Sequence, residues 1–147
     1  MLTRLIYISD VAEIFEFSDL QSILEKAQKN NPTLGVTGFL VMASKRFLQV
    51  IEGPAENVNL LFRKIIRDSR HADCRLIEYT EIADRLFDQW SMRGIHPGLM
   101  DQRLKAFLQR KYGTDQRGGL AVPEDRFTAI SFLYDVAHAD AIVEGLG

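Results

Sequence analysis

The sequence predicts an α+β fold: a ferredoxin-like βαββαββ sheet with two helices on one face, followed by two C-terminal helices. Two observations predict it. Short runs rich in β-branched and aromatic residues alternate with stretches whose apolar residues recur every three or four positions. In addition, the 147 residues, 46% of them hydrophobic and 26% charged, have the size and composition of one globular domain.

The first strand is expected over residues 2–9. Alternation along a strand places Tyr7 on one face together with Leu5 and Ser9. Buried tyrosines commonly find a hydrogen-bond partner for the hydroxyl group. We therefore expect Tyr7 to need a polar partner if this face is covered.

The first helix follows, and Ser18 with Gln21 has the form of a capping box at its start. Pro32 is expected to end this helix, because the residue before a proline is disfavoured in the helical conformation. Asn30 and Asn31 would then lie at the C-terminal exit of the helix, where asparagine is tolerated.

Two apolar runs, residues 35–43 and 46–51, are joined by a short polar turn and predict a hairpin. A second helix is expected to begin at Gly53-Pro54, because proline is well tolerated in the first turn. The polar residues 68–73 are expected to end it.

The last two strands are expected at residues 75–80 and 86–92, and they complete a first unit over residues 1–93. A break at Gly94–Gly98 separates it from residues 94–147. This helical extension predicts one helix ending at Gly113 and another from Pro123 to about Val143. We expect it to pack on the same domain, because a sheet covered on one face only would expose the other.

Composition and charge exclude several classes of protein. The net charge is −2, and 18 basic residues are outnumbered by 20 acidic ones, which disfavours nucleic-acid binding. The basic cluster of Arg63, Lys64, Arg67 and Arg70 is either a local basic patch or, as we expect from its pattern, a solvated helix face. No apolar run is long enough to span a membrane. The single cysteine, Cys74, excludes an internal disulfide, and we expect a cytoplasmic protein.

Two groups of carboxamides are the most informative local features. Gln49 shares a strand face with Phe47 and Ile51, so its amide must find partners if that face is buried. It is either a structural glutamine or a functional one, and a contact with Tyr7 is expected if both face one layer. Asn30 and Asn31 either end a helix or bind a ligand edge that alternates acceptors and donors.

Metal and hydrolase chemistry find no support in the sequence. His71, His96 and His138 are widely spaced, which disfavours a zinc site, and Cys74 has no signature of a nucleophile. The sequence also lacks a phosphate-binding loop, a dinucleotide fingerprint and the serine-hydrolase motif. We therefore expect neither a metal nor a catalytic residue, and no enzymatic activity.

Taken together, the motifs resemble the BLUF family of blue-light receptors that use FAD. The resemblance covers residues 1–93. The segments that carry it are Leu5-Ile6-Tyr7-Ile8-Ser9, Asn30-Asn31, Gly35-Val36-Thr37-Gly38-Phe39-Leu40, Phe47-Leu48-Gln49-Val50-Ile51-Glu52-Gly53, Asp68-Ser69-Arg70-His71 and Phe87-Asp88-Gln89-Trp90-Ser91-Met92. The remaining residues contain no recognisable output domain, so the chain resembles the short, single-domain type.

The resemblance implies non-covalent FAD between the first two helices. Asn31 and Asn30 would hold the pyrimidine edge of the ring, with Gln49 beside it. Lys64, Arg70 and His71 fall where the family contacts the ribityl-phosphate side.

It also implies the photochemistry. Tyr7 would donate an electron and a proton after light absorption, and Gln49 would relay between Tyr7 and the ring, exchanging its donor and acceptor ends. Trp90 and Met92, expected on the fifth strand, would change environment on switching.

The output would then be a change in the interaction with a downstream signalling protein, from a homo-oligomer. The alternative function is a small-ligand-binding or enzymatic domain of ferredoxin-like fold without photochemistry. A third, an RNA-binding module, lacks the basic residues that its strands would need. The colour of the purified protein distinguishes the first function from the others.

Overall fold

A computed structural model describes residues 1–13, 15–96 and 100–145 and has the expected α+β fold. Its sheet has five strands in the order β4-β1-β3-β2-β5. Neighbouring strands are antiparallel except for β2 and β5, which are parallel. The strands are β1 (Leu2–Val11), β2 (Thr37–Ala43), β3 (Arg46–Pro54), β4 (His71–Ile82) and β5 (Arg93–Ile95).

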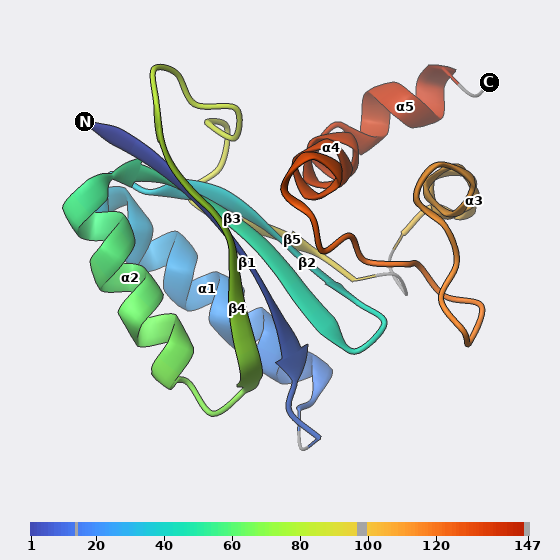
Figure 1. Ribbon diagram of the computed structural model, residues 1–147, viewed down its shortest axis with the longest axis horizontal. Coiled ribbons are helices and arrows are strands. Elements are labelled where there is room, and N and C mark those ends of the chain that lie inside the picture. Colours follow the sequence, from blue (N-terminus) through green and yellow to red (C-terminus); the bar gives the residue numbers. More distant parts are fainter. Residues whose placement is uncertain (14, 97–99, 146–147) are drawn as a thin grey trace.

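Helices cover both faces of this sheet (Figure 1). α1 (Phe17–Leu34) and α2 (Ala55–Arg67) lie side by side on one face. The C-terminal helices lie on the other side, with α4 nearest the sheet. These helices are α3 (Gln102–Tyr112), α4 (Arg126–Ala137) and α5 (Ala139–Gly145).

The alternation of side chains along the strands divides the core into two layers. Tyr7 lies in the layer under α1 and α2, as do Phe47 and Ile51 of β3. Ile6 and Val50 point to the opposite face, where the layer is completed by apolar residues of α3 and α4. The extension after β5 therefore shares a core with the sheet.

The start of α1 differs from the prediction. Glu16, rather than Ser18, precedes the helix, and its side chain and that of Asp19 form a reciprocal capping box. The backbone N–H of Glu16 donates to Asp19 Oδ2 at 2.8 Å. A carboxylate accepts these N–H groups as well as a hydroxyl does, so the box begins two residues earlier.

The end of α1 also differs, because the helix continues through Pro32. Proline removes one N–H donor without breaking a helix that is already in its last turn. The helix ends at Gly35, which has a left-handed φ of 65° and donates its N–H to carbonyls of that turn. Asn31 thereby lies inside α1 and is buried.

Near α2 the prediction was shifted by a few residues. Gly53 and Pro54 belong to the end of β3, and Pro54 immediately precedes the helix. After Asp68 the chain turns at once into β4, which begins at His71 rather than at residue 75.

The predicted strand at residues 86–92 was wrong. These residues belong to an irregular crossover between β4 and β5, residues 83–92, and the fifth strand is Arg93–Ile95. Trp90 and Met92 therefore precede the strand instead of lying on it. The predicted break at 94–98 begins within β5, and its residues Pro97 and Gly98 lie outside the described residues.

The predicted helix from Pro123 to Val143 is divided in two. α4 begins after Asp125, whose side chain accepts the N–H of Thr128 at 3.0 Å. It ends at His138, and α5 begins at the next residue. Apolar periodicity continues across this junction, which explains why the sequence pattern indicated a single helix.

Candidate functional site

A cavity of about 300 Å³ opens between α1 and α2, above the central strands. Its floor is formed by Tyr7 of β1 and Gln49 of β3, and its walls by α1 and α2. The predicted site residues that line it are Tyr7, Asn30, Asn31, Gln49, Lys64, Arg70 and His71. Seven residues from five separate places in the sequence therefore meet in one cavity.

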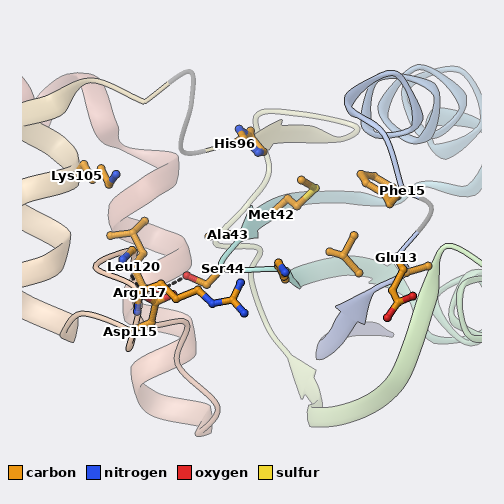
Figure 2. A pocket seen from close by; sticks show the side chains of 14 residues that line it. Glu13, Phe15, Met42, Ala43, Ser44, His96, Lys105, Asp115, Arg117 and Leu120 are labelled. Atoms are coloured by element: carbon orange, nitrogen blue, oxygen red, sulfur yellow. Dashed lines mark hydrogen bonds between the residues drawn. The ribbon is translucent and has the colours of Figure 1, made fainter.

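A larger hollow, of about 740 Å³, lies elsewhere (Figure 2). It is bounded by the turn between β2 and β3 on one side and by the loop after α3 on the other. Lys45, Lys105 and Arg117 line it, and none of the site residues predicted from the sequence does. The cavity between α1 and α2 is therefore the candidate site, in spite of its smaller volume.

The Tyr7 phenol and the Gln49 carboxamide are in direct contact on the floor of the cavity. The two residues are register partners in β1 and β3, and Tyr7 Oη donates a hydrogen bond to Gln49 Oε1. Burial raises the pKa of the Tyr7 phenol well above its usual value, because the charged form would lose its hydration. The hydroxyl therefore keeps its proton and acts as the donor at neutral pH.

Gln49 uses the other end of its amide toward the crossover. Its Nε2 donates to Met92 Sδ at 3.4 Å. Met92 is buried, and Gly38 of β2 leaves the space that its terminal methyl fills, since a Cβ at Gly38 would lie 2.9 Å from Met92 Cε. The two ends of one carboxamide are thus held by a phenol and a thioether.

Aromatic rings surround the Tyr7 phenol. The ring centroid of Phe62 lies 5.7 Å from that of Tyr7, and the His71 ring lies at 5.9 Å. His71 Nδ1 also contacts Ser9 Oγ at 2.9 Å. Burial lowers the pKa of His71, so the imidazole is neutral at pH 7. The surroundings of the phenol are therefore largely apolar.

The two asparagines differ in their surroundings. Asn31 is 1% exposed, and its Nδ2 donates to the carbonyl oxygen of Ser91 at 2.8 Å. Asn30 is exposed and lines the same cavity from the adjacent position on α1. Asn31 thus connects the cavity to the crossover, while Asn30 keeps an exposed amide at its edge.

Cationic side chains of both α1 and α2 line the cavity. Lys64 of α2 was expected, whereas Lys26 of α1 was missed. Lys26 precedes Asn30 by four residues and therefore lies on the same face of a helix, so this spacing could have revealed it.

Asp68 belongs to a motif that the sequence singled out, and its contacts change the interpretation of Arg70. Arg70 Nε donates to Asp68 Oδ1 at 2.9 Å and Nη2 to Oδ2 at 2.5 Å. This paired hydrogen bond lowers the pKa of Asp68 to about 2. Much of the Arg70 charge is therefore neutralised, and Lys26 and Lys64 supply the positive charge of the cavity.

The structure places Trp90 away from this site. Its ring packs edge-on against Phe39, with centroids 5.7 Å apart, in the core layer on the opposite face of the sheet. The Arg93 guanidinium lies over the same ring at 5.2 Å. Of the two crossover residues predicted to take part, only Met92 contacts Gln49.

The residues of the cavity fit a planar heteroaromatic ligand that carries phosphate. Apolar side chains from the facing sides of α1 and α2 suit the faces of a ring. Carboxamides at one end can pair with a ring edge of alternating donors and acceptors. Lys26 and Lys64 suit the phosphate groups.

Comparison with known proteins agrees with this chemistry. Residues 2–93 match the BLUF family, described as sensors of blue light using FAD. The alpha subunit of photoactivated adenylate cyclase from Euglena gracilis is 35% identical over 97 residues, which are 65% of this chain and 10% of the cyclase subunit. The chain thus spans about a tenth of the length of that relative.

Two solved structures resemble nearly the whole chain. BlrB, a BLUF protein in its dark state, is 29% identical with a TM-score of 0.74, covering 94% of this chain and 96% of its own. The ground state of BlsA is 27% identical with a TM-score of 0.78, covering 93% and 88%. Within the described residues, no helix has the length and hydropathy needed to cross a bilayer.

Proposed function

This chain belongs to the BLUF family of blue-light sensors, and we propose that it binds its FAD in the cavity between α1 and α2. It is a blue-light photoreceptor that uses FAD. This family membership favours photoreception over the alternative of a ferredoxin-like domain without photochemistry. The observation that carries the proposed site is the direct contact of Tyr7 and Gln49 on the cavity floor.

Each side of the cavity has its own role in the proposal. Asn30 and Asn31 pair with the pyrimidine edge of the ring, next to Gln49. Lys64, Arg70 and His71 lie toward the ribityl-phosphate side, and Lys26 joins them. When bound, FAD supplies the absorption of blue light and a ring that accepts an electron once excited.

The photochemical donor in the proposal is Tyr7. Its hydroxyl proton already lies on a hydrogen bond to Gln49 Oε1, so loss of an electron from the phenol releases the proton along that bond. Gln49 then exchanges its donor and acceptor ends. Because the two ends are chemically different, the exchange changes which hydrogen bonds reach the ligand.

Met92 makes the two orientations of the Gln49 amide unequal. In the observed orientation the amide accepts from Tyr7 and donates to Met92 Sδ. A thioether accepts hydrogen bonds but has no proton to donate. The reversed orientation therefore loses the Met92 contact, which supports a light state that decays in darkness.

The output in the proposal is conformational. Residues 1–93 act as the sensor, and the extension 94–147, packed on the same domain, carries the change to a downstream signalling protein. We propose a homo-oligomer in the cytoplasm with no reaction of its own. The relatives include cyclases named as photoactivated, which supports control of a separate activity by the sensor region. Pull-downs compared in light and darkness would identify the partner.

The test of the function is spectroscopic. Protein purified with FAD should be yellow, and blue light should shift its flavin absorption to longer wavelength, with full reversal in darkness. A colourless protein, or a yellow one without a reversible shift, would contradict the proposal. The same sample measured by light scattering in both states gives the number of subunits.

A further inference from the structure

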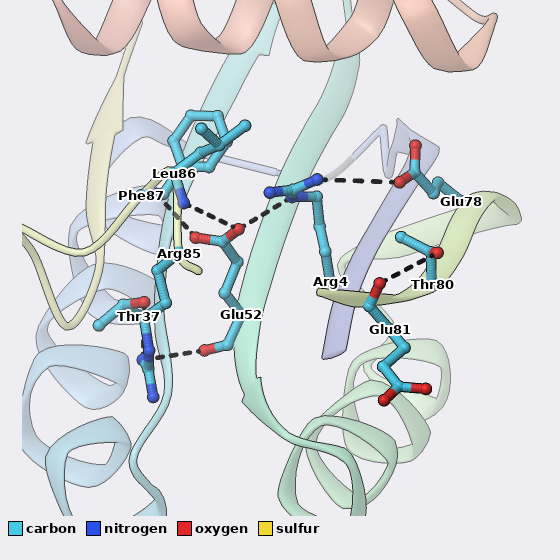
Figure 3. Close-up of polar contacts among 9 residues, drawn as sticks. All are labelled: Arg4, Thr37, Glu52, Glu78, Thr80, Glu81, Arg85, Leu86 and Phe87. Atoms are coloured by element: carbon cyan, nitrogen blue, oxygen red, sulfur yellow. Dashed lines mark hydrogen bonds and ion pairs between the residues drawn. The ribbon is translucent and has the colours of Figure 1, made fainter. Parts of the chain in front are cut away.

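A buried carboxylate holds the crossover between β4 and β5, which comprises residues 83–92. Glu52 of β3 is fully buried on the sheet face opposite to Gln49. Its carboxylate accepts the N–H of Phe87 at 2.7 Å, the N–H of Leu86 at 3.2 Å and Arg4 Nε at 2.8 Å (Figure 3). A carboxylate is tolerated in such a place only when it is paired and hydrogen-bonded, as it is here.

Arg85 anchors the same end of the crossover. Its Nη2 donates to the carbonyl oxygen of Gly35, at the end of α1, at 2.7 Å. Its Nη1 donates to Thr37 Oγ1 at 2.9 Å and to the carbonyl oxygen of Glu52 at 3.3 Å. Two charged side chains therefore fix the start of the crossover to β3 and to the end of α1.

The other end of the crossover lies at the cavity. Ser91 accepts from Asn31 Nδ2 at 2.8 Å through its carbonyl oxygen, and Met92 Sδ accepts from Gln49 Nε2 at 3.4 Å. The backbone between the two ends has no regular secondary structure. Beside Gln49, the carbonyl oxygen of Met92 accepts from Gln28 Nε2 at 3.1 Å, and that of Trp90 accepts from the N–H of Gly38 at 3.1 Å. The position of Met92 therefore depends on these contacts together with those that hold the start of the segment.

We propose that Glu52 is a positioning residue for the photochemical amide, acting together with Arg4 and Arg85. By fixing the backbone at Phe87, Glu52 contributes to the position at which the Met92 sulfur contacts the Gln49 amide. This inference rests on the proposed exchange of the Gln49 amide and adds the groups that control its rate. The Gln49 amide can reverse only when the Met92 side chain moves away from Nε2. A firmly anchored crossover therefore slows the reversal.

The test is Glu52→Gln, which keeps the shape and removes the charge. The new NH₂ group cannot accept from the donors that surround it, so at least one anchor contact is lost. We expect FAD to be retained and the dark recovery to become about tenfold faster, equivalent to ~1.4 kcal/mol in the barrier. Thermal unfolding is measured alongside, because a merely structural role would lower the melting temperature and leave the recovery rate unchanged.

Glu78→Gln is the matched control. Glu78 is also buried and faces Arg4 Nη1 at 4.0 Å, and its other described partner is Arg126 rather than the crossover. Its recovery should stay within about twofold of the unmodified protein, well below the tenfold change that corresponds to ~1.4 kcal/mol. Equal acceleration in both variants would assign the effect to the charge of the network and would overturn the positioning role.

A second variant keeps the inference testable if Glu52→Gln does not fold. Arg85→Gln removes the other anchor without leaving a buried charge unpaired, and we expect it to accelerate recovery in the same direction. Unchanged recovery in a folded, yellow variant overturns the inference. If the unmodified protein shows no light-induced shift, the proposed function fails as well, which distinguishes the two results.

Discussion

Tyr7 and Gln49 face each other across β1 and β3, and the phenol donates to the carbonyl end of the carboxamide. The amino end of the same carboxamide donates to Met92 Sδ. Each end of the Gln49 amide thus has a partner suited to it, and reversal of the amide would mismatch the thioether. This asymmetry makes the two orientations of the amide unequal in free energy, which the proposed exchange requires.

Tyr7→Phe tests the donor. Phenylalanine preserves the ring but removes the hydroxyl proton, so we expect FAD to remain bound and the reversible shift to be lost. Absorption spectra before and after blue light measure it. Tyr79→Phe is a control, since Tyr79 lies on β4 with its hydroxyl bonded to Asn59. A full shift in Tyr7→Phe would exclude Tyr7 as the donor.

Gln49→Leu tests the relay. Leucine occupies a similar volume without a donor or an acceptor, so the variant should be yellow and unresponsive to light. The lost bond leaves the buried Tyr7 hydroxyl without its partner, which should lower the free energy of unfolding by about 1–3 kcal/mol. Urea unfolding in darkness measures this loss of stability. A light-induced absorption shift of normal size in the variant would contradict the proposed relay.

Met92 and Trp90 should behave differently although two positions separate them. Met92→Leu removes the sulfur acceptor of Gln49, so we expect a normal primary shift with a dark recovery altered several-fold. Trp90→Phe retains a ring against Phe39 on the opposite face and should leave both the primary shift and the recovery close to normal. Time-resolved absorption at the shifted band measures the size of the shift and the rate of dark recovery in each variant. The opposite ranking of the two variants would refute the assignment of Met92.

The central strands could be predicted from the sequence because their signal is local. The alternation around Tyr7 and around Gln49 fixed both side-chain faces without knowledge of the fold. Since the two strands pair, their shared face brought the phenol to the amide. The family motifs supplied the asparagines and the basic residues, whose convergence on one cavity no local pattern would indicate.

The crossover could not be predicted because its conformation depends on distant residues. Leu86, Phe87 and Trp90 resemble strand residues, yet the backbone makes no regular strand ladder. It is held by the Glu52 carboxylate, by Arg85 and by one hydrogen bond from the N–H of Gly38 to the carbonyl oxygen of Trp90. The misplaced helix ends have a similar origin. Pro32 is tolerated because Gly35 supplies the terminating conformation three residues later.

Lys26→Gln tests the residue that the sequence analysis missed. Its charge faces the cavity from α1, so removal should weaken FAD binding about two- to fivefold, the range of an exposed ion pair. Lys29→Gln is the matched control on the same helix, since Lys29 is exposed and outside the cavity lining. Titration of the apoprotein with FAD at low and high salt measures the affinity. Equal losses in both variants would place Lys26 outside the phosphate side.

His71 should make stability depend on pH in a defined direction. Burial lowers its pKa, the nearby Arg70 charge adds to this, and Asp68 opposes it. Between an unfolded value of about 6.5 and the lower folded value, the unfolded chain binds the proton first. The stabilisation is therefore complete above pH 6.5 and is lost as the pH falls through this window. Urea unfolding at fixed FAD concentration should show a flatter profile for His71→Gln than for the unmodified protein. Parallel profiles for the two proteins would show that His71 does not titrate in this window.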